Sequence, residues 1–429
     1  MRLSPFLASQ VRQGCKQDRG YRKLIAVFGF DPTSCRLRIG NQLMDRRTFV
    51  KAGCIGSASL LMQGLDPMLP ADVPPPAAPP IELHGPPDYK PSPLGMPGLF
   101  PGRVIEVRGP NAIVGNRVSQ SIVRQMLEHA MKELTEEKSA QAAWAKFVEP
   151  NDIVGIKINP SGAPACCSSP EILREIIGSV QSVGVPARNI LVYDRYSYEM
   201  DIGSYQALLP PGVRIVGIQD TFVDSSGYDT NVYCAANFFG EWETRSYMAN
   251  IVAQLVTKII NVPTMKDHSA SGVTGCLKNL AYGTFNNVAR SHRAPHSFTN
   301  PLIGLMCTVE PLRSKAVLHI MDGMRQVWHG GPLTQVQDFI DQAGILLVAT
   351  DPVALDTIEL EAIEKKRRER GAPSLWQHDP NSITTDNNDF YHDAAKNLFF
   401  RQPGHVAAAG KLGLGAADLK QIDHRTLSA

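Results

Sequence analysis

The pattern that most constrains the fold is a strand, a helix and a second strand in direct succession. Asp152–Asn159 alternates β-branched residues with small and polar ones and is predicted to be a buried strand. Ser169 and Pro170 then provide an N-cap and a proline in the first helical turn, and isoleucines at helical spacing continue until Gly184. Asn189–Asp194 is the next predicted strand. Such a unit predicts parallel strands joined by a right-handed crossover.

Similar patterns recur along the chain. Further strands are predicted at Arg103–Val107, Val213–Ile218, Lys258–Val262, Ala316–Met321 and Ile345–Ala349. Further helices are predicted at Ser119–Leu134 and from Pro352 to about Arg367, the second capped by Asp351. We therefore expect an α/β fold, with a mixed, mostly parallel sheet, helices on both faces and Rossmann-like βαβ units. The basic run 365–370 is expected to form the solvated end of the last helix.

Composition excludes several classes of protein. Apolar residues make up 43% of the chain and charged residues 20%, which is ordinary globular usage, and the net charge of +2 does not favour a nucleic-acid partner. The eight cysteines contain no C-x-x-C pair, so an iron–sulfur cluster held by closely spaced thiolates is not expected. Five cysteines lie beyond residue 78, and this odd number predicts that at least one remains a thiol or pairs with another chain.

Polar residues follow the predicted strands, where ligands collect in open α/β sheets. These residues are Lys157, Asn159, Asp194, Lys266, His268, Asp322 and Asp351. Each has an ordinary structural explanation by itself, such as a helix cap or a turn. Because they share one predicted edge of one sheet, we interpret them together as a candidate site.

The densest polar stretch runs from Asn261 to Gly283 and enters a helix near Thr274. Backbone N–H groups at that helix start, together with Lys266, Lys278 and His268, predict a site for an anion. The spacing of a phosphate-binding P-loop is missing. We assign catalytic roles to His268, Lys266, His292 and Asp322, and substrate-binding roles to Lys157, Asn159, Thr274, Lys278, Asn279 and Asp194. A metal ion is also open, with His268, His292 and His329 as candidate ligands.

The N-terminal region differs from the rest. Residues 44–78 resemble a twin-arginine signal peptide, with Arg46 and Arg47 ahead of a short apolar run. This predicts export through the twin-arginine translocation machinery to the periplasm or beyond, without a stable transmembrane anchor. Residues 1–43 are expected to be an upstream extension, with translation starting at Met44. Twelve prolines between residues 70 and 101 predict an extended linker over 79–102.

Several separated motifs in residues 103–425 resemble the domain-of-unknown-function 362 family. They are Gly155-Ile-Lys157-Ile-Asn159, Lys266-Asp-His268, Gly272-Val-Thr-Gly-Cys-Leu-Lys278-Asn279, Asp351-Pro-Val-Ala-Leu-Asp356 and Gly410-Lys-Leu-Gly413-Leu-Gly415. The resemblance extends from about Val104 to Ile422. Many relatives also carry ferredoxin-like cysteine clusters, and this chain does not. The family implies no settled activity.

Two functional classes follow from these residues. The first is an exported enzyme that acts on an anionic small molecule, in which lysines hold the substrate, His268 or His292 moves a proton and Asp322 orients the histidine. The second is a periplasmic protein that binds an anionic ligand through the same lysines without turnover. Folded export would allow a cofactor to be inserted before translocation.

Overall fold

The computed structural model describes the following residues of the chain: 37–39, 42–44, 77–220, 226–292, 297–377 and 403–429. The chain divides into two units, Met1–Asp66 and Pro67–Ala429. In the first unit, β1 (Leu37–Ile39) and β2 (Gln42–Met44) pair as antiparallel strands. Most of the predicted extension and signal peptide, including Arg46 and Arg47, lies outside the described residues.

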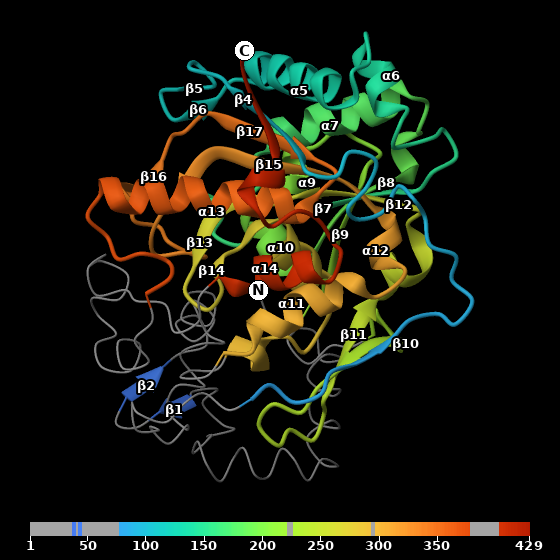
Figure 1. Cartoon of the computed structure of the whole chain (residues 1–429), viewed down its shortest axis with the longest axis vertical. Helices are drawn as coiled ribbons and strands as arrows, with labels where there is room; N and C mark the ends of the chain where they lie inside the picture. The colour runs from blue at the N-terminus through green and yellow to red at the C-terminus, as the bar shows by residue number, and fades with distance from the viewer. Residues whose placement is uncertain (1–36, 40–41, 45–76, 221–225, 293–296, 378–402) are drawn as a thin grey trace, which may run out of the picture. The chain divides into compact units, whose positions relative to one another are not determined.

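One large sheet forms the centre of the second unit (Figure 1). Its strand order is β18 (Asp423–Ser428), β4 (Arg103–Arg108), β17 (Ile345–Ala349), β15 (Ala316–Val327), β12 (Lys258–Val262), β7 (Val154–Ile158), β8 (Ile190–Tyr196) and β9 (Arg214–Gln219). The strands from β15 to β9 are parallel, as are β18 and β4, whereas β17 is antiparallel to both its neighbours. The predicted α/β fold with a mixed, mostly parallel sheet is confirmed.

Helices cover both faces of this sheet. One face carries α5 (Gln120–Thr135), α6 (Ala140–Trp144) and α7 (Pro170–Ser182), and the other carries α10 (Gly275–Thr284), α11 (Thr299–Thr308), α13 (Pro352–Glu369) and α14 (Gly404–Lys411). Alternation along β7 places Val154, Ile156 and Ile158 in the core beneath α5 and α7. Gly155 and Lys157 consequently face α10. The sequence pattern of β7 therefore puts a lysine inside the interface between helix and sheet.

The proline-rich segment 79–102 belongs to the second unit and packs on the rest of it. Within it, β3 (Glu82–His84) pairs with β10 (Tyr228–Ala235), which pairs in turn with β11 (Arg245–Ala249). Later in the segment, the Phe100 N–H donates to Oγ1 of Thr350 at 3.0 Å. Pairing of β3 with β10 shows that the density of prolines in this segment does not prevent strand hydrogen bonds there. The five residues between Pro80 and Pro86 contain no proline and keep their N–H donors.

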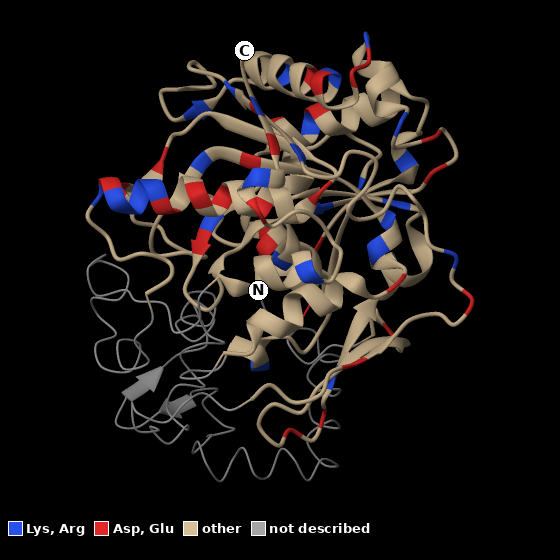
Figure 2. Cartoon of the chain, viewed as in Figure 1, with Lys and Arg blue, Asp and Glu red and all other residues tan. Residues whose placement is uncertain are grey.

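Most predicted elements lie within a few residues of their predicted bounds, but two details are wrong. First, β15 continues to Val327 instead of ending at Met321, because β17 still pairs with it at Asp322 and Gly323. Second, Arg367 does not belong to a solvated face, although charged residues are frequent along α13 (Figure 2). Among the described residues, no helix is long and apolar enough to cross a membrane.

Candidate functional site

A buried polar network lies between α10 and the central strands. Lys157 Nζ donates to the carbonyl oxygen of Ile158 at 2.6 Å and to Asn279 Oδ1 at 3.1 Å, and it forms an ion pair with Asp194. Asn279 Oδ1 also accepts from Asn159 Nδ2 at 3.0 Å. Burial lowers the pKa of Lys157, and the negative charge of Asp194 opposes this effect. Four residues predicted to bind substrate are thus brought together, but as partners of one another.

Asn261 extends this network toward β15. Its Oδ1 accepts from Asn279 Nδ2 at 2.8 Å, and its Nδ2 donates to the Cys276 carbonyl oxygen at 3.1 Å and to His319 Nδ1 at 3.2 Å. Burial lowers the pKa of His319 to about 3, so this imidazole is neutral. Sequence reasoning did not assign Asn261 to the site. An asparagine inside the apolar run of β12 was the signal that could have found it.

The N-terminus of α10 is occupied by carboxylates of the chain itself. Asp356 of α13 accepts from the N–H groups of Cys276, at 2.5 Å, and Leu277, at 3.0 Å. The neighbouring Glu359 accepts from the Lys266 N–H at 2.9 Å. The prediction that this helix start binds an external anion is therefore wrong. These carboxylates satisfy the free N–H groups that an anion would need.

Lys266 and Asp267 lie on β13 (Thr264–His268), which pairs with β14 (Gly272–Val273) and with β15. Lys266 is fully buried, and its Nζ donates to the carbonyl oxygen of Ser161 at 2.6 Å. The Ser161 hydroxyl donates to Glu199 Oε2 at 2.7 Å. Burial, followed by the charge of Asp194, raises the pKa of Glu199. Ser161 therefore links a buried cation to an acid that sequence reasoning missed.

His329 belongs to a different cluster. Its Nδ1 lies 3.2 Å from Nη1 of the fully buried Arg367, which also donates to the Trp328 carbonyl oxygen at 3.0 Å. Arg367 Nη1 is 3.8 Å from Oδ2 of Asp267, whose Oδ1 accepts from the Gly331 N–H at 2.7 Å. Burial raises the pKa of Asp267 to about 7. Arg367 is buried because α13 packs against the loop that follows β15.

Lys278 of α10 differs from the other two lysines because it is partly exposed. Its Nζ lies 4.8 Å from the centroid of the Tyr282 ring, which is a cation–π contact. No ion pair or hydrogen bond of this ammonium is formed with the described residues. Burial, followed by the positive charges of Lys266, Arg195 and Lys157, lowers the pKa of Lys278 to about 7.

Two predicted histidines lie beside this lysine. The ring centroids of His268 and His292 are 5.5 Å apart, and the His292 ring stands edge-on to Tyr282 at 5.0 Å. Burial and the charge of Lys278 lower the pKa of both histidines, that of His292 to about 3. His268 Nδ1 accepts from the Ala270 N–H at 3.1 Å. The neutral His268 ring therefore carries its proton on Nε2 and presents a hydrogen-bond donor there.

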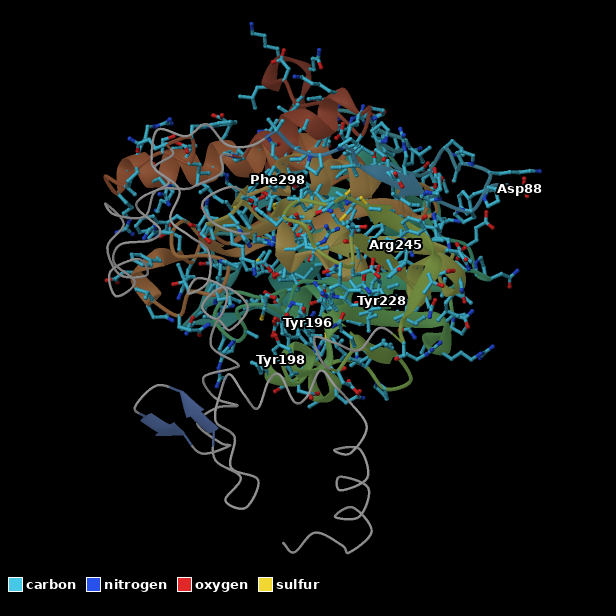
Figure 3. The ribbon with its side chains drawn as sticks, turned by 90° about the horizontal axis from the view of Figure 1, so that it is seen from below. Asp88, Tyr196, Tyr198, Tyr228, Arg245 and Phe298 are labelled. Carbon is cyan, nitrogen blue, oxygen red and sulfur yellow. The ribbon has the colours of Figure 1, made fainter. Side chains whose placement is uncertain are left out.

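Two further residues, Arg195 and His405, are coupled electrostatically to Lys278. The Arg195 guanidinium lies 4.8 Å from the Tyr196 ring centroid, and Tyr196 lies beside Tyr198 (Figure 3). His405 of α14 is fully buried, and neither of its ring nitrogens has a hydrogen-bond partner in the described part of the chain. Burial and Lys278 lower the pKa of His405 to about 3. Nothing in the local sequence distinguished Arg195, Tyr282 or His405 as site residues.

Thr274 and Asp322 have structural positions. The Thr274 N–H donates to the Lys266 carbonyl oxygen at 3.0 Å, while its buried hydroxyl has no partner among the described residues. Asp322 accepts from the N–H groups of Ser169 at 2.6 Å and Met324 at 2.9 Å. Its carboxylate therefore stabilises the start of α7 and the backbone of its own strand, β15. The prediction that Asp322 orients His268 or His292 is wrong, because both its oxygens are used elsewhere.

The metal prediction receives no supporting geometry. Over the described ranges, no group of three or more His, Cys, Asp or Glu side chains is arranged to hold a metal ion. His268 and His292 are adjacent, but His329 packs with Arg367 and Phe339 instead. The cysteines at 166, 167, 234, 276 and 307 are all free, which confirms the prediction of at least one thiol.

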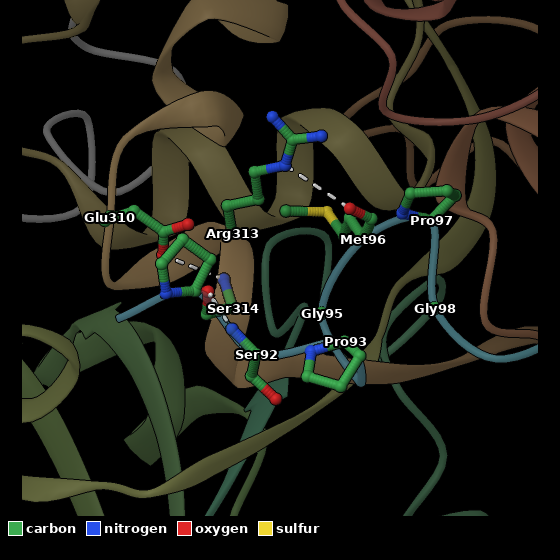
Figure 4. A pocket seen from close by; sticks show the side chains of 10 residues that line it. Ser92, Pro93, Gly95, Met96, Pro97, Gly98, Glu310, Arg313 and Ser314 are labelled. Atoms are coloured by element: carbon green, nitrogen blue, oxygen red, sulfur yellow. Dashed lines mark hydrogen bonds between the residues drawn. The ribbon is translucent and has the colours of Figure 1, made fainter. Parts of the chain in front are cut away.

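A pocket with a volume of about 270 Å³ lies away from these residues, between the proline-rich segment and α12 (Leu312–Lys315) (Figure 4). Because α12 precedes β15, this pocket is at the N-terminal end of a strand that is parallel to β12. The lysines lie at the opposite strand ends. In the pocket wall, Ser314 Oγ accepts from the Ser92 N–H at 3.0 Å, and Arg313 donates to the Met96 carbonyl oxygen at 3.4 Å. The prolines and the hydrogen-bonded groups that line this pocket do not indicate a reaction.

Comparison with known proteins identifies the domain that carries the cluster around Lys278. Residues 154–361 match the family model described as Domain of unknown function (DUF362). No curated protein matches the chain. The matched region begins at β7 and ends within α13, so it includes Lys157, Lys266, His268 and Lys278. The chain therefore contains a DUF362 domain at residues 154–361.

Proposed function

We propose that this chain is an enzyme that binds a small anionic molecule beside Lys278 and transfers a proton to or from it. The observation that carries the proposal is a partly exposed lysine that forms no ion pair or hydrogen bond with the described residues. Lys266, Arg195 and Lys157 add positive charge around it. A carboxylate or phosphate would supply the missing negative charge and would be attracted by all four cations.

Two features favour catalysis over binding alone. The pKa of Lys278 is about 7, so this side chain can both accept and release a proton near neutral pH. His268 is neutral and presents an Nε2–H donor, which can polarise a substrate oxygen without bringing another charge. Binding without turnover is the alternative that the following experiment separates.

Small anions are expected to raise the melting temperature of the protein. At ten times the dissociation constant of phosphate, malonate or pyruvate, the stabilisation should be about 1.4 kcal/mol, or roughly 2 °C for a chain of this size. Lys278 is protonated below its pKa of about 7, so the shift should be full below pH 7 and decline as the pH rises above it. Thermal unfolding at pH 6 and pH 8.5 measures this difference.

Lys278→Met should abolish the shift. The variant should remain folded, because methionine removes an ammonium that is costly to desolvate. Lys315→Met is the matched control: burial also lowers the pKa of Lys315, to about 8, but its Nζ donates to the Val252 carbonyl oxygen at 2.7 Å, away from the cluster. This control should keep the shift. If Lys278→Met responds to anions like the wild type, the proposed site is excluded.

Solvent deuterium separates catalysis from binding. NMR of pyruvate in D₂O with the full chain should show exchange of its carbon-bound protons, and His268→Gln should slow this exchange at least tenfold. A thermal shift without exchange of any probe would favour the binding protein.

We also propose that the chain is exported in the folded state through the twin-arginine translocation machinery. The order and spacing of Arg46, Arg47 and the apolar run after them support this proposal. The substrate would then be met outside the cytoplasmic membrane. Replacing both arginines by lysine should keep the protein in the cytoplasm, as fractionation followed by immunoblotting would detect. Unaltered export of that variant would contradict the proposal.

A further inference from the structure

Lys278 is the lysine of the cluster whose amine is available to react. Lys157 is 1% exposed and its Nζ has three protein acceptors, and Lys266 is 0% exposed with its Nζ bound to Ser161. Lys278 is partly exposed and contacts only the face of Tyr282. Its nitrogen forms no hydrogen bond or ion pair with the described residues, whereas the other two cannot leave their acceptors without exposing buried charges.

The surroundings of Lys278 favour the neutral amine. A lysine enclosed by protein and placed next to other cations loses its proton more readily, and the neutral amine is the nucleophilic form. Here the neighbouring cations are Lys266, Arg195 and Lys157, and Glu199 opposes them only in part. The cation–π contact with Tyr282 favours the charged form, but it is weaker than these effects.

A proton donor lies in the same cluster. His292 packs against the Tyr282 ring that Lys278 covers, and His268 packs against His292. The Nε2–H of neutral His268 is a donor for an oxygen that gains negative charge beside Lys278. Addition of an amine to a carbonyl group uses the neutral amine and a proton donor, and the cationic surroundings attract an anionic substrate to them.

We propose that Lys278 forms an imine with the carbonyl carbon of a small oxo acid, whose carboxylate is attracted by the positive charges around Lys278. This inference rests on the proposed anion site and names its substrate class. The neutral amine attacks the carbonyl carbon, a C–N bond forms, and the C=O π electrons move to the oxygen. That oxygen accepts a hydrogen bond from His268 Nε2–H, takes both protons of the amine nitrogen and leaves as water as the C=N bond forms. No oxidant or reductant is consumed.

Reductive trapping tests the imine. The full chain is incubated with pyruvate or acetoacetate and treated with sodium borohydride, which reduces the C=N bond to a stable secondary amine. Intact mass spectrometry should show one adduct per chain, and peptide mapping should place it on Lys278. Lys278→Arg should form no adduct at this position, because a guanidinium is not nucleophilic at neutral pH. Lys315→Arg is the matched control and should still be trapped at Lys278.

The outcomes distinguish the imine from the anion site. Adducts spread over many lysines, or an equal yield in Lys278→Arg, would overturn the imine. If trapping fails while pyruvate still raises the melting temperature in a Lys278-dependent way, the imine is overturned and the proposed anion site stands. If neither trapping nor a thermal shift is observed, both are overturned.

Discussion

Gly283→Ala is expected to lower the free energy of unfolding by about 3–5 kcal/mol, the cost of breaking a buried ion pair. A Cβ atom at this position of α10 would overlap Cε and Nζ of Lys157 and approach Oδ1 of Asp194 to 3.1 Å. Because α10 packs closely on β7, the lysine has no free space on this side. Its displacement would separate Lys157 from Asp194 and Asn279. Urea unfolding, followed by far-UV circular dichroism, measures the loss.

Gly178→Ala is the matched control for this substitution. Gly178 also lies within a helix, α7, but a Cβ atom there meets no other atom within 4 Å. Alanine should therefore stabilise the protein by about 0.5–1 kcal/mol, because it restricts the unfolded chain and favours the helix. If both alanine variants had the same stability, close packing of α10 on Lys157 could not be the reason for a glycine at 283.

The fold was readable from the sequence because its main signals are local. The strand–helix–strand unit from β7 to β8 is indicated by alternating apolar residues in the first strand, by a helix start at Ser169 and Pro170, and by Gly184 after the helix end. β13 was missed because Pro263 follows β12 and suggests its end, whereas the chain resumes pairing with β15 only one residue later. Such strand boundaries depend on pairing with other strands, and the local sequence pattern of a segment does not show which strand it will pair with.

The candidate site was less readable from the sequence than the fold, because its contacts join residues that are far apart in the chain. Strand ends brought Lys157 and Asp194 into contact, because the carboxyl ends of parallel strands lie at one edge of the sheet. Whether a side chain serves a ligand or another part of the protein depends on distant partners. The Asp322 carboxylate accepts a hydrogen bond from the Ser169 N–H, and Ser169 lies 153 positions away along the chain. Likewise, Arg195 and His405 join Lys278 only through the packing of β8, α10 and α14.

The start of α10 depends on such a distant partner, and Asp356→Asn is therefore expected to destabilise the protein by about 2–4 kcal/mol. The Asp356 carboxylate accepts from the buried N–H groups of Cys276 and Leu277, one with each oxygen. An asparagine amide has a single acceptor oxygen, and its NH₂ group would face one of these donors. One buried N–H would lose its partner. The helix that carries Lys278, Asn279 and Gly283 would then be less firmly held.

Urea unfolding at pH 5 and pH 8 tests both the size and the sign of this effect. The pKa of Asp356 is raised from 3.8 to about 7 by burial, so ionisation is harder in the folded protein than in the unfolded chain. Wild-type stability should therefore fall relative to Asp356→Asn as the pH rises from about 4 to about 7, and the deficit of the variant should be larger at pH 5. Asp341→Asn is the matched control. Asp341 is partly exposed and pairs with Lys366 and Arg370, so its loss should cost less than about 1 kcal/mol. Equal losses in the two variants would mean that the Asp356 carboxylate does not hold the start of α10, and the N-terminus of that helix would again be available to an external anion.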